Sequence, residues 1–147
     1  MATDEASLEK RAAAGDVAAC MQLGRRLLRG RGVARDYERA LACFDTAARA
    51  GDADAFYLMG KCYMKGVGCS KDPEGAVSCL ENAARRGHAT AALKLGACFE
   101  QGVGAPQSDE LAAYWYRKAA ARGESCAYDE LLRLGRKTGM QKGKEEA

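Results

Sequence analysis

The chain has 147 residues, of which 48% are hydrophobic and 29% charged, and its 23 basic and 20 acidic side chains give a net charge of +3. This hydrophobic share can build a core, so disorder along the whole chain is excluded, and the charge is too low for a basic coat that binds nucleic acid. No hydrophobic run approaches the roughly 20 residues that a membrane-spanning helix needs.

The first element, residues 1–16, is predicted to be a short capping helix, and it shows no targeting signal. Asp4 and Glu5 stand where a signal peptide carries cations, and no hydrophobic stretch follows them. Transit peptides are poor in acidic residues, so this class is disfavoured as well. We therefore expect a cytoplasmic protein, with the nucleus as the alternative.

The residues that follow repeat with a period of 36, as the series Gly15, Gly51, Gly87 and Gly123 shows. Such a period is typical of a solenoid, in which each unit buries its hydrophobic face only by stacking on its neighbours. The predicted units are 17–52, 53–88 and 89–124. A C-terminal capping helix at 125–138 and a flexible polar tail at 139–147 are expected to follow them.

Each unit predicts two helices joined by a loop that contains glycine. In the middle unit, hydrophobic residues recur at helical spacing over 53–65, and Gly66 suits a left-handed C-cap. The second helix begins at Asp72, an N-cap residue followed by a proline that fits the first turn. Asp36 and Ser108 hold the same place in the other units. The pattern predicts an all-α solenoid of helix-turn-helix repeats.

A glycine stands in the middle of the first helix of every unit, at Gly24, Gly60 and Gly96. Glycine destabilises a helix interior by about 1 kcal/mol relative to alanine. We therefore predict that the second helix of the same unit lies so close that it leaves no room for a Cβ atom. The alanine pairs of the second helices, such as Ala83-Ala84, are the expected complement.

This pattern resembles the Sel1-like repeat, a relative of the tetratricopeptide repeat, over residues 15–135. Trp115 stands at the tryptophan position of the family's second helix, where the first two units have Cys43 and Cys79. Sel1-like proteins are mostly adaptors that hold other proteins in the groove of a right-handed superhelix. The resemblance therefore implies binding and not catalysis. The middle unit carries the pattern at Ala55, Leu58-Met59-Gly60, Tyr63, Gly66-Val67-Gly68, Asp72, Ala76, Ala83-Ala84 and Gly87.

Seven cysteines raise the questions of metal binding and disulfides. Cys62, Cys69 and Cys79 are 7 and 10 residues apart, which does not match the spacing of zinc ligands. In cysteine-rich relatives, cysteines eight residues apart bridge the two helices, but Ala12 stands eight residues before Cys20. Because the count is also odd, we expect seven thiols and no metal.

Four of these thiols are expected to face the core, at Cys43, Cys62, Cys79 and Cys98. Cys69 and Cys126 are the two candidates for reactivity. The single histidine, His88, is expected to cap or solvate the start of a first helix. The Gly-x-Gly pairs lie between two helices and do not follow a strand, so they do not predict a phosphate loop. We expect no catalytic residue and no cofactor.

One feature goes beyond packing. In a tetratricopeptide-like frame, the first helices and the last helix present seven cationic and three acidic residues on the concave surface. Arg25 and Arg29 are four residues apart, as are Lys61 and Lys65. Like charges at this spacing repel by about 0.2–0.5 kcal/mol per pair, so helix stability does not explain these cations. A solvated basic face is the simpler interpretation, but methionines and a tyrosine lie between the cations. The predicted partner-binding residues are Met21, Arg25, Leu28, Arg29, Tyr57, Lys61, Met64, Lys65, Leu93, Glu100, Arg133, Arg136 and Lys137.

The sequence therefore predicts a non-catalytic adaptor or scaffold that binds an acidic, partly apolar segment of a partner protein in its concave groove. Two alternatives stay open, a small cysteine-rich redox or cofactor-binding protein and a binder of RNA or phospholigands on the basic groove. The expected partner is a protein or peptide, and neither a membrane nor nucleic acid is expected. The oligomeric state is not predicted.

Overall fold

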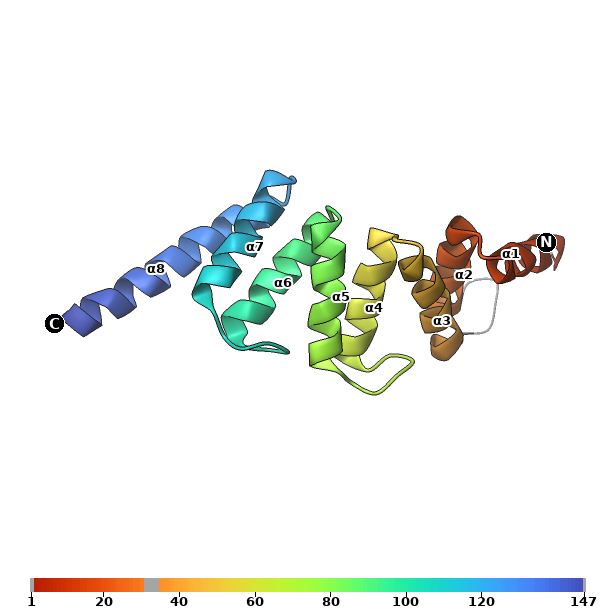
Figure 1. Ribbon diagram of the computed structural model, residues 1–147, viewed down its shortest axis with the longest axis horizontal. Coiled ribbons are helices and arrows are strands. Elements are labelled where there is room, and N and C mark those ends of the chain that lie inside the picture. Colours follow the sequence, from red (N-terminus) through yellow and green to blue (C-terminus); the bar gives the residue numbers. More distant parts are fainter. Residues whose placement is uncertain (1, 31–34, 147) are drawn as a thin grey trace.

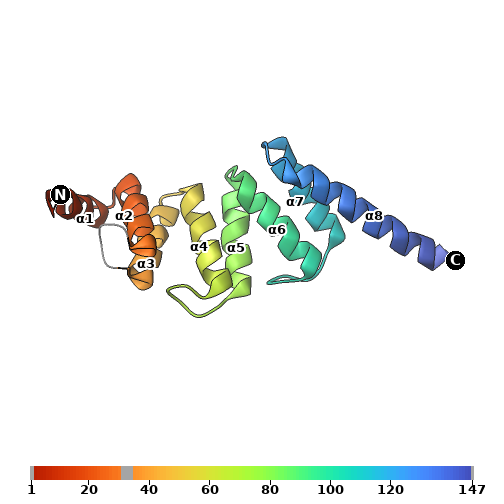
Figure 2. The same ribbon diagram turned by 180° about the vertical axis from the view of Figure 1, so that it is seen from behind.

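The computed structural model describes residues 2–30 and 35–146, with side chains for 5–30 and 35–139. Its helices follow one another in an elongated row with the chain ends at opposite extremes (Figure 1; from behind in Figure 2). No described residue lies in a strand, so the predicted all-α solenoid is confirmed. The helices are α1 (Ala2–Ala13), α2 (Val17–Arg29), α3 (Tyr37–Arg49), α4 (Ala53–Lys65), α5 (Pro73–Arg85), α6 (Ala89–Gln101), α7 (Asp109–Ala121) and α8 (Cys126–Glu146).

The helix ends of the three units lie where the capping residues predict them. The Asp72 carboxylate accepts a hydrogen bond of 3.0 Å from the Gly75 N–H at the start of α5. Asp36 and Ser108 cap α3 and α7 in the same way. Gly66 ends α4 with a φ of 73°, in the left-handed region that favours glycine. Among the described residues, no helix is both long and hydrophobic enough to cross a bilayer.

The glycines in the middle of α2, α4 and α6 lie against the second helix of their own unit, as predicted. A Cβ atom built on Gly60 would lie 3.1 Å from Cγ of Leu80, and one built on Gly24 would lie 2.6 Å from the ring of Phe44. The alanine pairs are not the complement of these glycines, so that expectation was wrong. The side chain that contacts each glycine stands three residues before the alanine pair and fills the space that the missing Cβ leaves. These side chains are Phe44, Leu80 and Tyr116.

The loops between the paired helices connect successive units. A Cβ atom built on Gly68 would lie 2.5 Å from the carbonyl oxygen of Tyr37, in the first turn of the preceding second helix. Gly104 approaches the carbonyl group of Pro73 in the same way. Each of these loops therefore rests on the unit before it. The equivalent glycine of the first unit, Gly32, lies outside the described residues.

The two ends of the row differ. At the N-terminal end, Leu8 of α1 is buried in a cluster that includes residues of α2 and α3. At the C-terminal end, α8 continues past the predicted boundary at 138 to Glu146 and projects beyond α7 (Figure 1), so residues 139–146 of the expected flexible tail are helical, and residue 147 lies outside the described residues. Apart from Gly143, residues 141–146 are glutamine, lysine and glutamate, which favour helix and contain no proline that would end it.

Candidate binding groove

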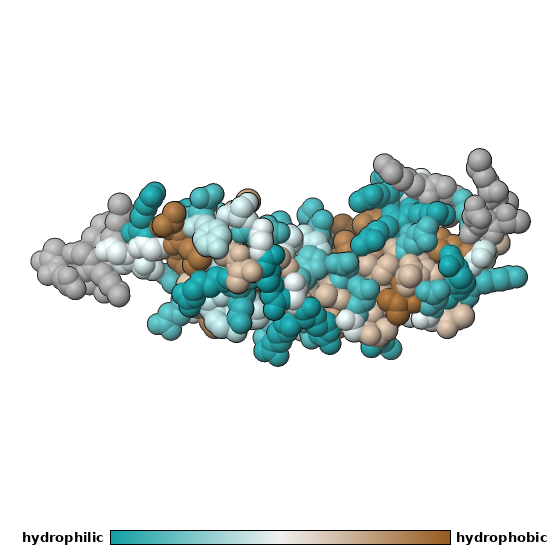
Figure 3. Space-filling model, turned by 90° about the horizontal axis from the view of Figure 1, so that it is seen from above, coloured by the Kyte–Doolittle hydropathy of each residue, from teal (hydrophilic) through white to brown (hydrophobic). Residues whose placement is uncertain are grey.

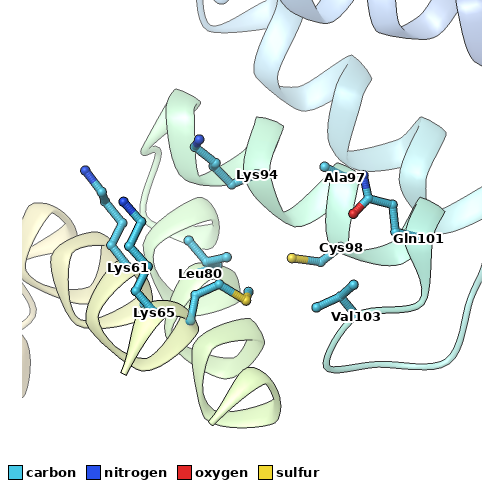
Figure 4. Close-up of a pocket in the computed structure, with 10 residues that line it drawn as sticks. Lys61, Lys65, Leu80, Lys94, Ala97, Cys98, Gln101 and Val103 are labelled. Carbon is cyan, nitrogen blue, oxygen red and sulfur yellow. The ribbon is translucent and has the colours of Figure 1, made fainter. Parts of the chain in front are cut away.

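A groove of about 340 Å³ opens between α4 and α6. Leu80 of α5 and Cys98 of α6 are buried and form its apolar floor. Figure 4 shows Lys61, Lys65 and Lys94 with their ammonium groups directed away from this floor. The full lining is Gly60, Lys61, Met64, Lys65, Leu80, Lys94, Ala97, Cys98, Gln101 and Val103.

The lining carries positive charge only. Lys61, Lys65 and Lys94 are exposed, and none of them forms an ion pair with another described residue. The Lys61 ammonium lies 5.5 Å from the centre of the Tyr57 ring, in cation–π geometry. Lys61 and Lys65 are four residues apart on α4, and like charges at this spacing repel. An anionic ligand over the groove would relieve this repulsion.

The structure brings part of the predicted site together here. Lys61, Met64 and Lys65 line the groove, and Leu93 of α6 is half-buried outside its lining. Leu28 is half-buried against the core cluster of the first unit. The placement of Met21 on an open surface was wrong. Its side chain is 6% exposed, because it packs in the hydrophobic cluster that extends from α1 to α4.

A second polar cluster lies beside the groove, between α2, α4 and the start of α6. The Arg25 guanidinium lies 4.0 Å from the Asp54 carboxylate, and Nε2 of His88 lies 3.1 Å from the same carboxylate. The Tyr57 ring stacks on His88 at a centroid distance of 4.4 Å. Nδ1 of His88 accepts the Ala91 N–H, so the predicted capping role is confirmed. Arg25 is thus partly neutralised, unlike the lysines of the groove.

The predicted residues near the last helix bind one another. Arg133 of α8 donates a hydrogen bond of 2.7 Å to Glu100 of α6, and the hydroxyl group of Tyr116 donates one of 3.0 Å to the same carboxylate. Lys137 lies 3.6 Å from Asp109 and 4.0 Å from Glu100. The hydrogen bonds from Arg133 lower the pKa of the Glu100 carboxyl below its ordinary value. This network joins α6, α7 and α8, and it leaves exposed Arg136 outside.

Three consecutive segments, 17–52, 53–88 and 89–124, match the model of the Sel1 repeat. The chain belongs to the Sel1 repeat family. Proteins of this family are generally non-catalytic scaffolds for protein interactions. No curated protein matches the chain.

Solved structures share this architecture. The Sel1 repeat protein from Oxalobacter formigenes is 35% identical with a TM-score of 0.80, over 88% of this chain and 98% of that one. The protective antigen c5321 of uropathogenic Escherichia coli is 29% identical with a TM-score of 0.81, over 84% of this chain and 27% of that one. Helicobacter pylori cysteine rich protein B is 20% identical with a TM-score of 0.68, over 85% and 95%, which shows the fold alone.

Sequence reasoning missed Lys94, by which the third Sel1 repeat adds a cation to the groove between α4 and α6. It stands two residues before Gly96 and is not among the residues that were assigned to the concave surface. Positions on a first helix that face the preceding repeat were the missing signal. For the network around Glu100 and Arg133, the missed signal was their separation of 33 residues, which is close to the 36-residue period.

All seven cysteines of the chain lie among the described residues and are free thiols. Burial raises the pKa of the Cys62 and Cys98 thiols, and it raises the pKa of Cys79 to about 11. Cys69 is half-buried, and burial together with the Asp72 carboxylate raises its thiol pKa as well. Thiolate, the reactive form, is therefore scarce at these four sites at neutral pH.

Of the two reactivity candidates, only Cys126 is exposed. The raised pKa of Cys69 makes it a poor nucleophile. Within residues 5–30 and 35–139, no group of three or more potential ligands could hold a metal ion.

Proposed function

We propose that this Sel1 repeat chain is an adaptor that binds an acidic, partly apolar segment of a partner protein in the groove between α4 and α6. One observation carries the proposal. Three exposed lysines surround an apolar floor, and no carboxylate lines the groove to neutralise them.

The size of the groove indicates what it accommodates. Its volume of about 340 Å³ is at the lower end of the range for small-molecule pockets. It therefore suits one or two side chains of a longer segment. Met64 supplies a flexible, polarisable wall that adapts to different apolar side chains. The lysines extend over the rim, where they attract carboxylates and accelerate association at low salt.

The free thiols are consistent with a reducing compartment, so we assign the adaptor to the cytoplasm. The raised pKa values at Cys62, Cys69, Cys79 and Cys98 disfavour the redox alternative, because catalytic thiols need a lowered pKa.

A set of fluorescent peptides tests the proposal. One peptide combines glutamates with leucines, a second replaces the leucines with serines, and a third replaces the glutamates with glutamines. Fluorescence polarisation should show that the first binds tightest and that added salt weakens its binding. The Lys61→Glu/Lys65→Glu variant should lose this binding and keep its helical circular dichroism spectrum.

The matched control is Arg117→Glu/Lys118→Glu, which makes the same charge change at exposed positions of α7 outside the groove. It should bind the first peptide as the wild type does. Equal losses in both variants would mean that net charge alone governs binding. A short single-stranded RNA that binds more tightly than every peptide would favour the phospholigand alternative and overturn the adaptor proposal.

A further inference from the structure

Helix α8 presents an uncovered row of residues at the C-terminal end of the solenoid. Tyr128 and Leu132 are 60% and 61% exposed and lie four residues apart, on one face of the helix. Gly135 and Gly139 continue the row, and a Cβ atom built on either would have no neighbour within 4 Å. Figure 3 shows strongly hydrophobic residues at the surface near this end. The row thus has two large side chains followed by two positions without one.

The repeat register restricts what covers this row. Leu132 stands 36 residues after Gly96, at the position where a glycine admits the second helix of each unit. A Cβ atom on Gly60 would already lie 3.1 Å from Leu80. The leucine therefore excludes a further second helix packed as in the three units. A surface of another shape must cover it.

We propose that this row binds a second copy of the chain through antiparallel pairing of the two α8 helices. With a two-fold axis between Leu132 and Gly135, Leu132 of each copy lies opposite Gly135 of the other. Tyr128 then lies opposite Gly139. Each large side chain thus meets a position without a side chain, and the symmetry makes both contacts twice. Parallel pairing would place tyrosine against tyrosine and leave the glycines facing an empty space.

The charges beside the row favour the same pairing. Asp129 and Arg136 are seven residues apart and flank the row on one side, and both are exposed. Neither forms an ion pair with another described residue. In an antiparallel helix pair, Asp129 of each copy faces Arg136 of the other, so two opposite-charge contacts form. A row of four positions buries less than the roughly 1,200 Å² of a stable interface, so the dimer is concentration-dependent.

Sedimentation velocity of the full chain tests this pairing between about 1 μM and 1 mM, the range of weak dissociation constants. The wild type should change from monomer to dimer across this range. Asp129→Arg alone and Arg136→Asp alone should each weaken the dimer about tenfold or more, because like charges then face each other. An equimolar mixture of the two variants should dimerise again, since every facing pair in the mixed dimer is of opposite charge.

A second variant separates pairing from folding. Gly135→Leu favours the helix but fills the position opposite Leu132, so the variant should keep its circular dichroism spectrum and lose the dimer. A wild type that stays monomeric overturns the proposal, as do charge variants that dimerise as the wild type does. A mixture that associates no better than its components overturns the antiparallel register. The Lys61→Glu/Lys65→Glu variant should dimerise normally, which keeps this test independent of the groove.

Discussion

Arg133 extends from α8 to Glu100 of α6, and the pair closes the C-terminal end of the solenoid with direct hydrogen bonds between guanidinium and carboxylate. The Glu100 side chain is only 9% exposed, so its charge depends on this partner. The same carboxylate accepts a hydrogen bond from the hydroxyl group of Tyr116, whose ring packs against Gly96. Charge pairing and helix packing are therefore joined at one residue.

Replacing Glu100 with glutamine should lower the free energy of unfolding by about 1–2 kcal/mol at pH 7, because hydrogen bonds to a charged group become neutral ones. The folded state lowers the pKa of this carboxyl, so its contribution is complete above the ordinary value of 4.5 and disappears as the pH falls through the folded-state pKa. Urea denaturation at neutral and acidic pH should show the difference between wild type and Glu100→Gln shrinking. A constant difference would contradict the assignment.

Glycine-to-alanine substitutions at three helix positions should rank by the space around each. Gly24→Ala should destabilise by about 1–3 kcal/mol, because the new Cβ would lie 2.6 Å from the Phe44 ring. Gly60→Ala should be close to neutral, since Leu80 needs to move little and the helix gains propensity. Gly135→Ala, in open space, should stabilise by up to about 1 kcal/mol. Thermal melts at low protein concentration check the order, and equal effects would contradict the close-contact account.

Charge reversal at Lys94 should weaken binding of the glutamate–leucine peptide as much as reversal at Lys61, because both side chains line the groove. Reversal at Arg25 should have a smaller effect, since this residue lies outside the lining and near the Asp54 carboxylate. Calorimetric titration at low salt gives the three affinities. A larger loss at Arg25 than at Lys94 would place the binding surface farther toward the N-terminus.

Thiol titration of the denatured, non-reduced protein should find all seven cysteines as thiols. In the native protein, Cys126 should react first with an alkylating reagent, because it is exposed. Cys79 should be among the slowest, given its raised pKa of about 11. Mass spectrometry of timed samples identifies the sites. A disulfide in the titration would favour the redox alternative over the adaptor.

Local signals in the sequence predicted most of the fold. The cap at Asp72 and the left-handed turn at Gly66 depend on a few neighbouring residues, so the 36-residue period was sufficient to place them. The groove was predicted only in part, because the approach of Lys94 to α4 depends on how successive units are inclined. The burial of Met21 depends on packing across several helices. Such inter-unit geometry is not encoded in the spacing of residues within one helix.

The contacts of Gly68 with Tyr37 and of Gly104 with Pro73 have a consequence for how such a chain changes length. Each of these loops contacts the first turn of the second helix in the preceding unit, so it has a fixed distance to span. An insertion of one or two residues in such a loop would therefore separate two units. A duplication or deletion of a complete 36-residue segment would recreate every such contact. The contacts between units are therefore kept only when complete repeats are added or removed, and each such repeat would add or remove a section of binding surface.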